Sequence, residues 1–196
     1  AASASDRASS SNCSDTAILT VKKPTPGRQY AYARKEDVNI VGVSANIEAR
    51  YGGLYGEPSC TCTAYQVAYA NVSDESSNPV NWVQSGWGRE RNAGSTNIIT
   101  YRYAEMQGTL YLVSYDANNA PAAGSNQTYR CDLTPSNGTW QYSYNGSNWE
   151  QFADNYSTNH FGTAALYPGE IYNKEDDMPG TAADKCRFQQ CQYRIN

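Results

Sequence analysis

Apolar and aromatic side chains alternate with polar ones through most of this 196-residue chain, in short runs separated by turn-forming residues. Successive side chains of a β-strand point to opposite faces, so this period of two predicts strands that bury one face. The period of 3.6 that marks an amphipathic helix hardly appears, and we expect no long helix. Turns are predicted where Gly, Pro and Asn cluster, at Pro24-Thr25-Pro26-Gly27, Tyr51-Gly52-Gly53, Asn92-Ala93-Gly94, Asn137-Gly138, Asn145-Gly146 and Pro179-Gly180.

Eleven such runs predict an all-β protein built from two packed antiparallel sheets, a β-sandwich of the jelly-roll or concanavalin-like kind. A chain of this length makes one domain, which buries about 70% of the surface that the unfolded chain exposes. We place this domain at residues 17–196. The expected strands are Ala17–Val21, Gln29–Ala33, Val38–Ile47, Thr63–Asn71, Val80–Trp87, Asn97–Met106, Thr109–Tyr115, Gln127–Leu133, Thr139–Tyr144, Phe161–Tyr172 and Cys186–Ile195.

Six cysteines, an even number, predict three disulfides that staple the sandwich in an exported protein. Cys186 and Cys191 could close a short loop, whereas Cys60 and Cys62 are expected to reach different partners because neighbouring strand positions point to opposite sides. The pairing as a whole stays open. Zinc binding is disfavoured, because Cys60-Thr61-Cys62 lacks the two-residue spacer of common zinc knuckles. The six residues are Cys13, Cys60, Cys62, Cys131, Cys186 and Cys191.

Six Asn-X-Ser/Thr sequences favour an extracellular location, because they are glycan acceptors on an export route. The candidate acceptors are Asn12, Asn71, Asn126, Asn137, Asn145 and Asn155. The chain opens on Ala1-Ala2-Ser3 without a leader, as expected of a processed secreted chain. A net charge of −4 without a basic stripe argues against a nucleic-acid partner, and no apolar run reaches the roughly 20 residues that span a bilayer.

Residues 1–16 form a Ser- and Ala-rich segment that cannot bury much apolar surface of its own. A segment of this composition becomes ordered when something holds it, and two arrangements are open. It can dock onto its own domain, or it can be donated as a strand to the exposed sheet edge of a neighbouring copy. The second arrangement predicts a homopolymer that assembles through this segment.

Tyrosine occurs 17 times and occupies alternate positions of the expected strands, as at Tyr101 and Tyr103. Such rings form cross-strand ladders and core, with each hydroxyl reaching a polar partner at the edge. They can also form an exposed surface that stacks on sugar rings or packs on another copy of the protein. A carbohydrate-binding surface would use Trp87, Trp140 or Trp149.

Three polar residues stand out on these strands: Gln84 in Val83-Gln84-Ser85-Gly86, Glu105 at the end of Tyr103-Ala104-Glu105, and Glu170 in Tyr167-Pro168-Gly169-Glu170-Ile171. Alternation puts Trp82 and Gln84 on one face of their strand, and it puts Tyr101, Tyr103 and Glu105 on one face of the next. A polar cluster among aromatic rings follows from this placement. Inward Gln and Glu side chains are either satisfied polar groups of the core or members of a site.

The order and spacing of these segments resemble those of the eqolisin glutamic peptidases, exported β-sandwich proteases, over roughly residues 38–172. In this resemblance Gln84 matches the family glutamine, Glu170 matches the family glutamate, and Glu105 supports them. A looser likeness, carried by Gly169-Glu170, is to the neprosin-type peptidases, which use two glutamates. The resemblance implies that a carboxylate takes a proton from water while the amide donates to the developing oxyanion.

No cofactor or metal is expected. Lys174-Glu175-Asp176-Asp177-Met178-Pro179-Gly180, and Asp116 with Asn118 and Asn119, could offer oxygen ligands to calcium, but both lack the alternating spacing of the known calcium loop and are ordinarily solvated turns. Ser-His-Asp or Cys-His chemistry is disfavoured, because His160 is the sole histidine and lies in a loop-like stretch.

These observations favour an extracellular structural or adhesive protein that assembles into a surface filament, because the peptidase resemblance rests on few residues. The first alternative is an acid glutamic endopeptidase that acts on peptide substrates, with Gln84 and Glu170 as the working pair and Glu105 supporting them. The second alternative is a carbohydrate-binding module whose partners are glycans. Whether the chain is an enzyme therefore stays open at the level of the sequence.

Overall fold

Ten β-strands make up the secondary structure of the residues that the computed structural model describes, which are 29–54, 64–76, 80–108, 111–134, 138–146, 148–152, 162–172, 178–180 and 186–196. Within these ranges no helix is long and apolar enough to cross a membrane. The strands are β1 (Gln29–Glu48), β2 (Ala64–Asp74), β3 (Asn81–Arg91), β4 (Ile98–Gln107), β5 (Tyr111–Asp116), β6 (Asn126–Leu133), β7 (Trp140–Tyr144), β8 (Glu150–Gln151), β9 (Gly162–Ile171) and β10 (Phe188–Ile195).

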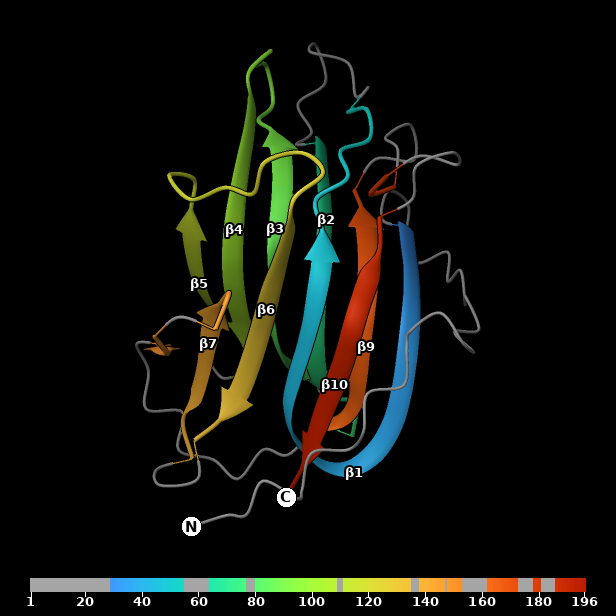
Figure 1. Cartoon of the computed structure of the whole chain (residues 1–196), viewed down its shortest axis with the longest axis vertical. Helices are drawn as coiled ribbons and strands as arrows, with labels where there is room; N and C mark the ends of the chain where they lie inside the picture. Colours follow the sequence, from blue (N-terminus) through green and yellow to red (C-terminus); the bar gives the residue numbers. More distant parts are fainter. Residues whose placement is uncertain are drawn as a thin grey trace.

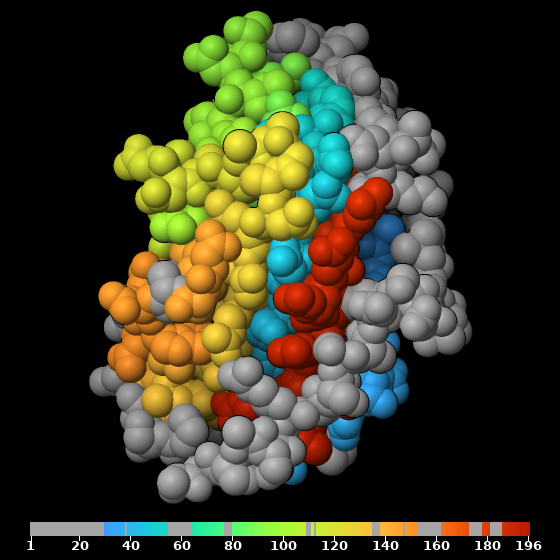
Figure 2. Space-filling view, in the orientation of Figure 1, coloured from blue at the N-terminus to red at the C-terminus, as the bar shows by residue number. Residues whose placement is uncertain are grey.

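The strands pair antiparallel in one continuous sheet, in the order β5-β4-β3-β2-β9-β1-β6-β7-β8, with β10 paired to β1. The sheet curls so that its two halves lie one in front of the other (Figure 1). We call β5, β4, β3, β2, β9 and the first half of β1 the back layer, and the second half of β1 with β6, β7, β8 and β10 the front layer. The outer face of the front layer shows β7, β6, β1 and β10 side by side (Figure 2). The all-β antiparallel sandwich is confirmed, but a single curled sheet supplies both layers in place of the two sheets expected.

β1 carries the chain from one layer to the other. Its residues 29–36 pair with β9 in the back layer, whereas residues 42–48 pair with β6 and β10 in the front layer. The register shifts between Glu36 and Ile40, and Asn39 has a φ of 57°. Asparagine tolerates this left-handed conformation better than most residues. The strands expected at 29–33 and 38–47 are therefore one bent strand.

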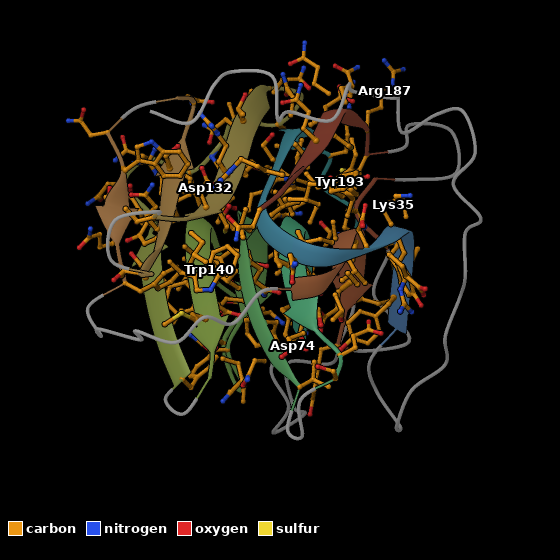
Figure 3. All side chains as sticks on the ribbon, turned by 90° about the horizontal axis from the view of Figure 1, so that it is seen from below. Lys35, Asp74, Asp132, Trp140, Arg187 and Tyr193 are labelled. Carbon is orange, nitrogen blue, oxygen red and sulfur yellow. The ribbon has the colours of Figure 1, made fainter. Side chains whose placement is uncertain are left out.

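The core lies between the two layers and is filled by the inward positions of the alternating strands. Trp87 of β3, Tyr129 of β6, and Ile40 and Ile47 of β1 are fully buried there. Trp140, on the β7 side of this space, is 5% exposed (Figure 3). Full burial of a side chain such as isoleucine contributes roughly 1.5–3 kcal/mol. This packing between the layers holds the curled sheet closed.

The expected disulfides are not all formed. Cys131 and Cys186 carry free thiols. Cys131 is buried in β6, where the residues opposite it are Val43 and Tyr142. Cys191 is disulfide-bonded, but Cys186 is not its partner, so the loop expected between these two cysteines is wrong. Cys13, Cys60 and Cys62 lie outside the described residues.

The expected strand positions agree with the structure for most of the described residues. β3 continues to Arg91, beyond the expected end at Trp87, and β4 begins at Ile98 across a short connection. The two-residue strand β8 was not expected, since two residues carry no period that can be recognised. The strand expected at 17–21 and the segment 1–16 lie outside the described residues, so the expected division of the chain stays a prediction.

Candidate functional site

A groove with a volume of about 600 Å³ lies on the face of the back layer that points away from the core. The two faces follow from alternation: Gln84 of β3 lines the groove, while Val83 and Trp87 of the same strand belong to the core. Four glutamates line it, Glu75, Glu90, Glu105 and Glu170. Its tyrosines are Tyr30, Tyr32, Tyr65, Tyr69, Tyr101, Tyr103, Tyr111 and Tyr115. We call this feature the tyrosine groove.

Two glycines of β3 keep the floor of the tyrosine groove open. By alternation, Gly86 and Gly88 face the groove between Gln84 and Glu90. A Cβ atom at Gly86 would lie 2.1 Å from the carbonyl oxygen of Ala68, and one at Gly88 would lie 2.6 Å from the ring of Tyr101. Because these side chains are missing, β2 can approach β3 closely and a tyrosine ring can lie across the strand.

Glu105 of β4 and Gln84 of β3 are directly opposite each other in the ladder, and their side chains are in contact. Nε2 of Gln84 donates to Oε2 of Glu105 at 2.9 Å and to the hydroxyl of Tyr103 at 3.3 Å. Oε1 of Glu105 accepts from the hydroxyls of Tyr111 and Tyr115 at 3.0 and 3.3 Å. The face shared by Tyr101, Tyr103 and Glu105 is confirmed, as is the one shared by Trp82 and Gln84.

Burial raises the pKa of Glu105, and the negative charge of Glu170 adds to the increase. The hydrogen bonds from Tyr111, Tyr115 and Gln84 stabilise the carboxylate and act in the opposite direction, but they do not cancel the effect of burial. Glu105 therefore keeps its proton to a higher pH than an ordinary glutamate. A carboxyl group of this kind is suited to proton transfer in mildly acidic solution.

Glu170 of β9 is buried in the same groove. The hydroxyls of Tyr65 and Tyr69 donate to its two carboxylate oxygens at 2.5 and 2.9 Å. The residue opposite Glu170 is Val67, four positions along β2 from the residue opposite Gln84, which corresponds to about 13 Å along the strand. The structure thus brings Gln84, Glu105 and Glu170 into one groove, but the glutamate next to Gln84 in the ladder is Glu105.

Tyr69 and Tyr103 lie between the two carboxylates and connect them. Their ring centroids are 6.4 Å apart at an interplanar angle of 68°. Burial raises the pKa of both phenols well above the ordinary value, and the nearby carboxylate, Glu170 for Tyr69 and Glu105 for Tyr103, raises each of them further. Both hydroxyls therefore stay protonated over the range in which the glutamates titrate.

Asn71 of β2 belongs to this cluster rather than to the glycan acceptors. It is 6% exposed, and its Nδ2 donates to Oε1 of Gln84 at 3.2 Å. A glycan on this amide would fill the groove and remove the hydrogen bond, so its burial argues against Asn71 as a glycan acceptor. Asn126 and Asn145 are exposed at the ends of front-layer strands and stay candidates. Asn12, Asn137 and Asn155 lie outside the described residues.

Two of the three tryptophans expected to stack on sugars are not accessible. Trp87 is 0% and Trp140 5% exposed, because both belong to the core between the layers. Trp149 is half-buried, and the guanidinium of Arg130 lies over its ring at 4.7 Å from the centroid. The carbohydrate-binding surface expected at these residues therefore loses Trp87 and Trp140.

Asp116, a candidate calcium ligand that the sequence disfavours, is already engaged within the protein. Oδ2 accepts from Arg102 at 2.6 Å, and Oδ1 accepts from the backbone amide of Asn119 at 3.1 Å. In the part of the chain that the structure describes, no group of three or more His, Cys, Asp or Glu residues could hold a metal ion. Most of the segment 174–180 and His160 lie outside the described residues.

Tyr65, Tyr69 and Glu90 also line the groove and were not predicted from the sequence. The available signal was the alternation within their strands, which puts Tyr65 and Tyr69 on the face of Asn71, and Glu90 on the face of Gln84. The pairing of β2 with both β3 and β9, which brings these residues together, has no signature in a single sequence.

No family model and no curated protein matches the sequence. Among solved structures, the chain is similar to a Bacillus subtilis protein of unknown function with a galectin-like fold, with a TM-score of 0.43 and 10% identity over 87% of this chain and 79% of that one. It is also similar to the SPRY domain of human HERC1, with a TM-score of 0.34 and 11% identity over 85% of this chain and 84% of that one.

Proposed function

We propose that this protein is an acid-active glutamic endopeptidase that binds extended peptides in the tyrosine groove. The observation that carries the proposal is the contact between Glu105 and Gln84 inside a groove that also holds Glu170. The raised pKa of Glu105 supports it, because an acid catalyst must hold its proton at the working pH. The eqolisin and neprosin-type resemblances of Gln84 and Glu170 support the same reaction class.

In the proposed reaction Glu170 acts as the base and Glu105 as the acid. Glu170 takes a proton from water as the water oxygen bonds to the scissile carbonyl carbon, and the amide of Gln84 donates to the developing oxyanion. Glu105 gives its proton to the amide nitrogen as the carbon–nitrogen bond breaks. The proton on Glu170 then passes to Glu105, which restores both groups. The hydroxyls of Tyr65 and Tyr69 suit the ionised form of Glu170, because both donate to it.

The pH dependence follows from these roles. Activity requires Glu105 to be protonated and Glu170 to be ionised, so the rate is expected to fall at high pH when Glu105 loses its proton and at low pH when Glu170 gains one. Because the pKa of Glu105 is raised, the high-pH limb lies above the range of an ordinary glutamate. The result is a bell-shaped profile with an optimum on the acid side of neutrality.

We also propose that the protein acts outside the cell. The sequons and the disulfide at Cys191 support an exported chain. Self-assembly through residues 1–16 and binding of glycans stay separate proposals, and neither is needed for peptide hydrolysis.

The test is hydrolysis of a broad peptide library between pH 3 and 7 by the native chain and by Glu105→Gln, Glu170→Gln and Gln84→Leu variants. We expect losses in kcat/KM of about 10²–10⁴-fold for each glutamate variant and about 10²–10³-fold for the glutamine variant. Glu150→Gln, in the front layer, is the matched control and should keep full activity. Circular dichroism checks the fold of each variant. No cleavage by the native chain at any pH, or cleavage that survives both glutamate variants, would refute the proposal.

A further inference from the structure

The charges that line the tyrosine groove are all negative among its described residues, but they are not equally neutralised. At one end, Glu75 accepts from Arg34 at 2.6 Å. At the other end, Glu90 accepts from the hydroxyl of Tyr101 at 3.2 Å, and no salt bridge joins it to a cation within the described part of the chain. The end of the groove at Glu90 therefore presents an uncompensated negative charge.

Aromatic rings surround Glu90. Tyr65 is opposite it in the ladder of β2 and β3, and Tyr101 donates to its carboxylate. The rings of Tyr101 and Tyr115 are in edge contact at 4.9 Å between centroids, and Tyr115 is 55% exposed. A carboxylate beside accessible tyrosine rings is the chemistry that binds an ammonium or guanidinium group, through an ion pair and through cation–π attraction.

The strand geometry sets the distance between this end and the reacting groups. Glu90 is six positions along β3 from Gln84, which is in contact with Glu105. It is only two positions from Gly88, which pairs with Val67, the residue that also pairs with Glu170. At a rise of about 3.4 Å per residue, a bond held between Glu170 and Gln84 lies about 7–20 Å from Glu90, the length of an extended peptide of about two to six residues.

We infer that the tyrosine groove selects extended peptides that carry lysine or arginine, and that Glu90 binds this side chain about two to six residues away from the bond that is cut. The inference rests on the proposed function for the position of the cut, but the binding of a cationic chain does not require hydrolysis. Glu90 is on this view a specificity-determining residue that contacts substrate without taking part in proton transfer.

Binding is tested with a hexamer of D-lysine, because a peptidase for L-peptides does not cleave it. Isothermal titration at pH 7 and at physiological salt compares the native chain with Glu90→Gln and with Glu150→Gln, which removes the same charge from the front layer. We expect about a tenfold weaker binding for Glu90→Gln, a change of less than twofold for Glu150→Gln, and no binding of the D-glutamate hexamer. No binding of D-hexalysine by the native chain, or an equal loss in both variants, overturns the inference.

The position of the cut is tested by sequencing the products of a peptide library. Lysine and arginine should be enriched about two to six residues from the cleaved bond. Glu90→Gln should remove the enrichment by raising KM for the basic peptides about tenfold. Cleavage without this enrichment refutes the inference and leaves the peptidase intact. Binding of D-hexalysine that depends on Glu90, without cleavage of any peptide, supports the cationic binding site and refutes the peptidase. A Tyr101→Phe variant, which removes only the hydroxyl that donates to Glu90, checks the site by a second route and should change binding of D-hexalysine more than Tyr167→Phe, whose hydroxyl donates to Gln192 elsewhere.

Discussion

Replacing Gly86 or Gly88, the two glycines under the tyrosine groove, with alanine should have different effects on the free energy of unfolding. In Gly86→Ala, the new methyl group would lie 2.1 Å from the carbonyl oxygen of Ala68 and 2.7 Å from Cα of Tyr69, where ordinary contacts are 3.4–4 Å. Backbone atoms cannot rotate away, so β2 and β3 must move apart by about an ångström. In Gly88→Ala, the nearest neighbours of the methyl group are atoms at the end of the Tyr101 ring, at 2.6–2.9 Å, and a rotation of that side chain relieves these contacts.

The magnitude follows from these contacts. Overpacking costs about 1–3 kcal/mol, and each ladder hydrogen bond lost as the strands separate costs about 1 kcal/mol. Alanine restricts the unfolded chain more than glycine does, which offsets roughly 0.4–1 kcal/mol of this. We therefore expect Gly86→Ala to lower the free energy of unfolding by about 2–4 kcal/mol, and Gly88→Ala by less than about 1 kcal/mol. For a domain of this size, the first change corresponds to a decrease in Tm of roughly 10 °C.

Urea unfolding followed by tryptophan fluorescence and by circular dichroism measures both variants under the same conditions. The groove gives an independent readout, because the methyl group at residue 88 displaces Tyr101 from its position beside Glu90. Gly88→Ala should therefore weaken the binding of D-hexalysine while leaving stability nearly unchanged. Equal losses of stability in the two variants would show that the close approach of β2 to β3 has been misjudged.

Three further measurements test other parts of the structure. The raised pKa of Glu105 gives stability that is fully present below its ordinary value of 4.5 and is lost as pH rises through the pKa of the folded protein. Glu105→Gln has no such loss, so its stability should increase relative to that of the native chain as pH rises from 4 to 7. A difference in urea unfolding that stays constant over this range would contradict this. Burial raises the pKa of Cys131 and of Cys186 to about 12. Iodoacetamide at pH 8 should therefore label neither thiol in the folded protein and both in urea. Rapid labelling of the folded protein, measured by mass spectrometry, would argue against the raised pKa of these thiols. Ile47→Ala should cost about 2–5 kcal/mol of unfolding free energy, against less than about 1 kcal/mol for the exposed Val113→Ala, and similar costs would argue against a core between the layers.

Local patterns in the sequence predict most of the strands and part of the groove. Alternation assigns Gln84 and Glu105 to the groove face of their strands because a strand has only two faces. It does not say which strands are neighbours, so the placement of Glu170 beside Tyr65 and Tyr69 depends on pairing between segments about 100 residues apart. The expected pairing of Gln84 with Glu170 came from a resemblance, and the ladder instead puts Gln84 next to Glu105.

Other features had no local signal at all. Residues 29–33 and 38–47 look like separate strands because the charged stretch 34–37 interrupts the apolar pattern between them. In the structure they are one strand, β1, which bends at Asn39. Whether a tryptophan faces the core or the solvent depends on the layer that covers it, which is why Trp87 and Trp140 were misjudged as sugar-stacking residues. Cysteine pairing is likewise decided by tertiary distance, and nothing near Cys131 in the sequence shows that valine and tyrosine will be its neighbours.

The bent strand β1 also determines when the domain can form. Its partners β6, β9 and β10 all come later in the chain, at residues 126–133, 162–171 and 188–195, and are therefore distant from it in sequence. During synthesis on the ribosome, β1 emerges before all three partners and stays unpaired until β6 has left the exit tunnel. The sheet therefore closes only after β9 and β10 have also emerged. With long-range pairings of this kind, folding is expected on the millisecond-to-second scale typical of β proteins with high contact order, and until then both edges of β1 are open to chaperones or to another unfinished chain.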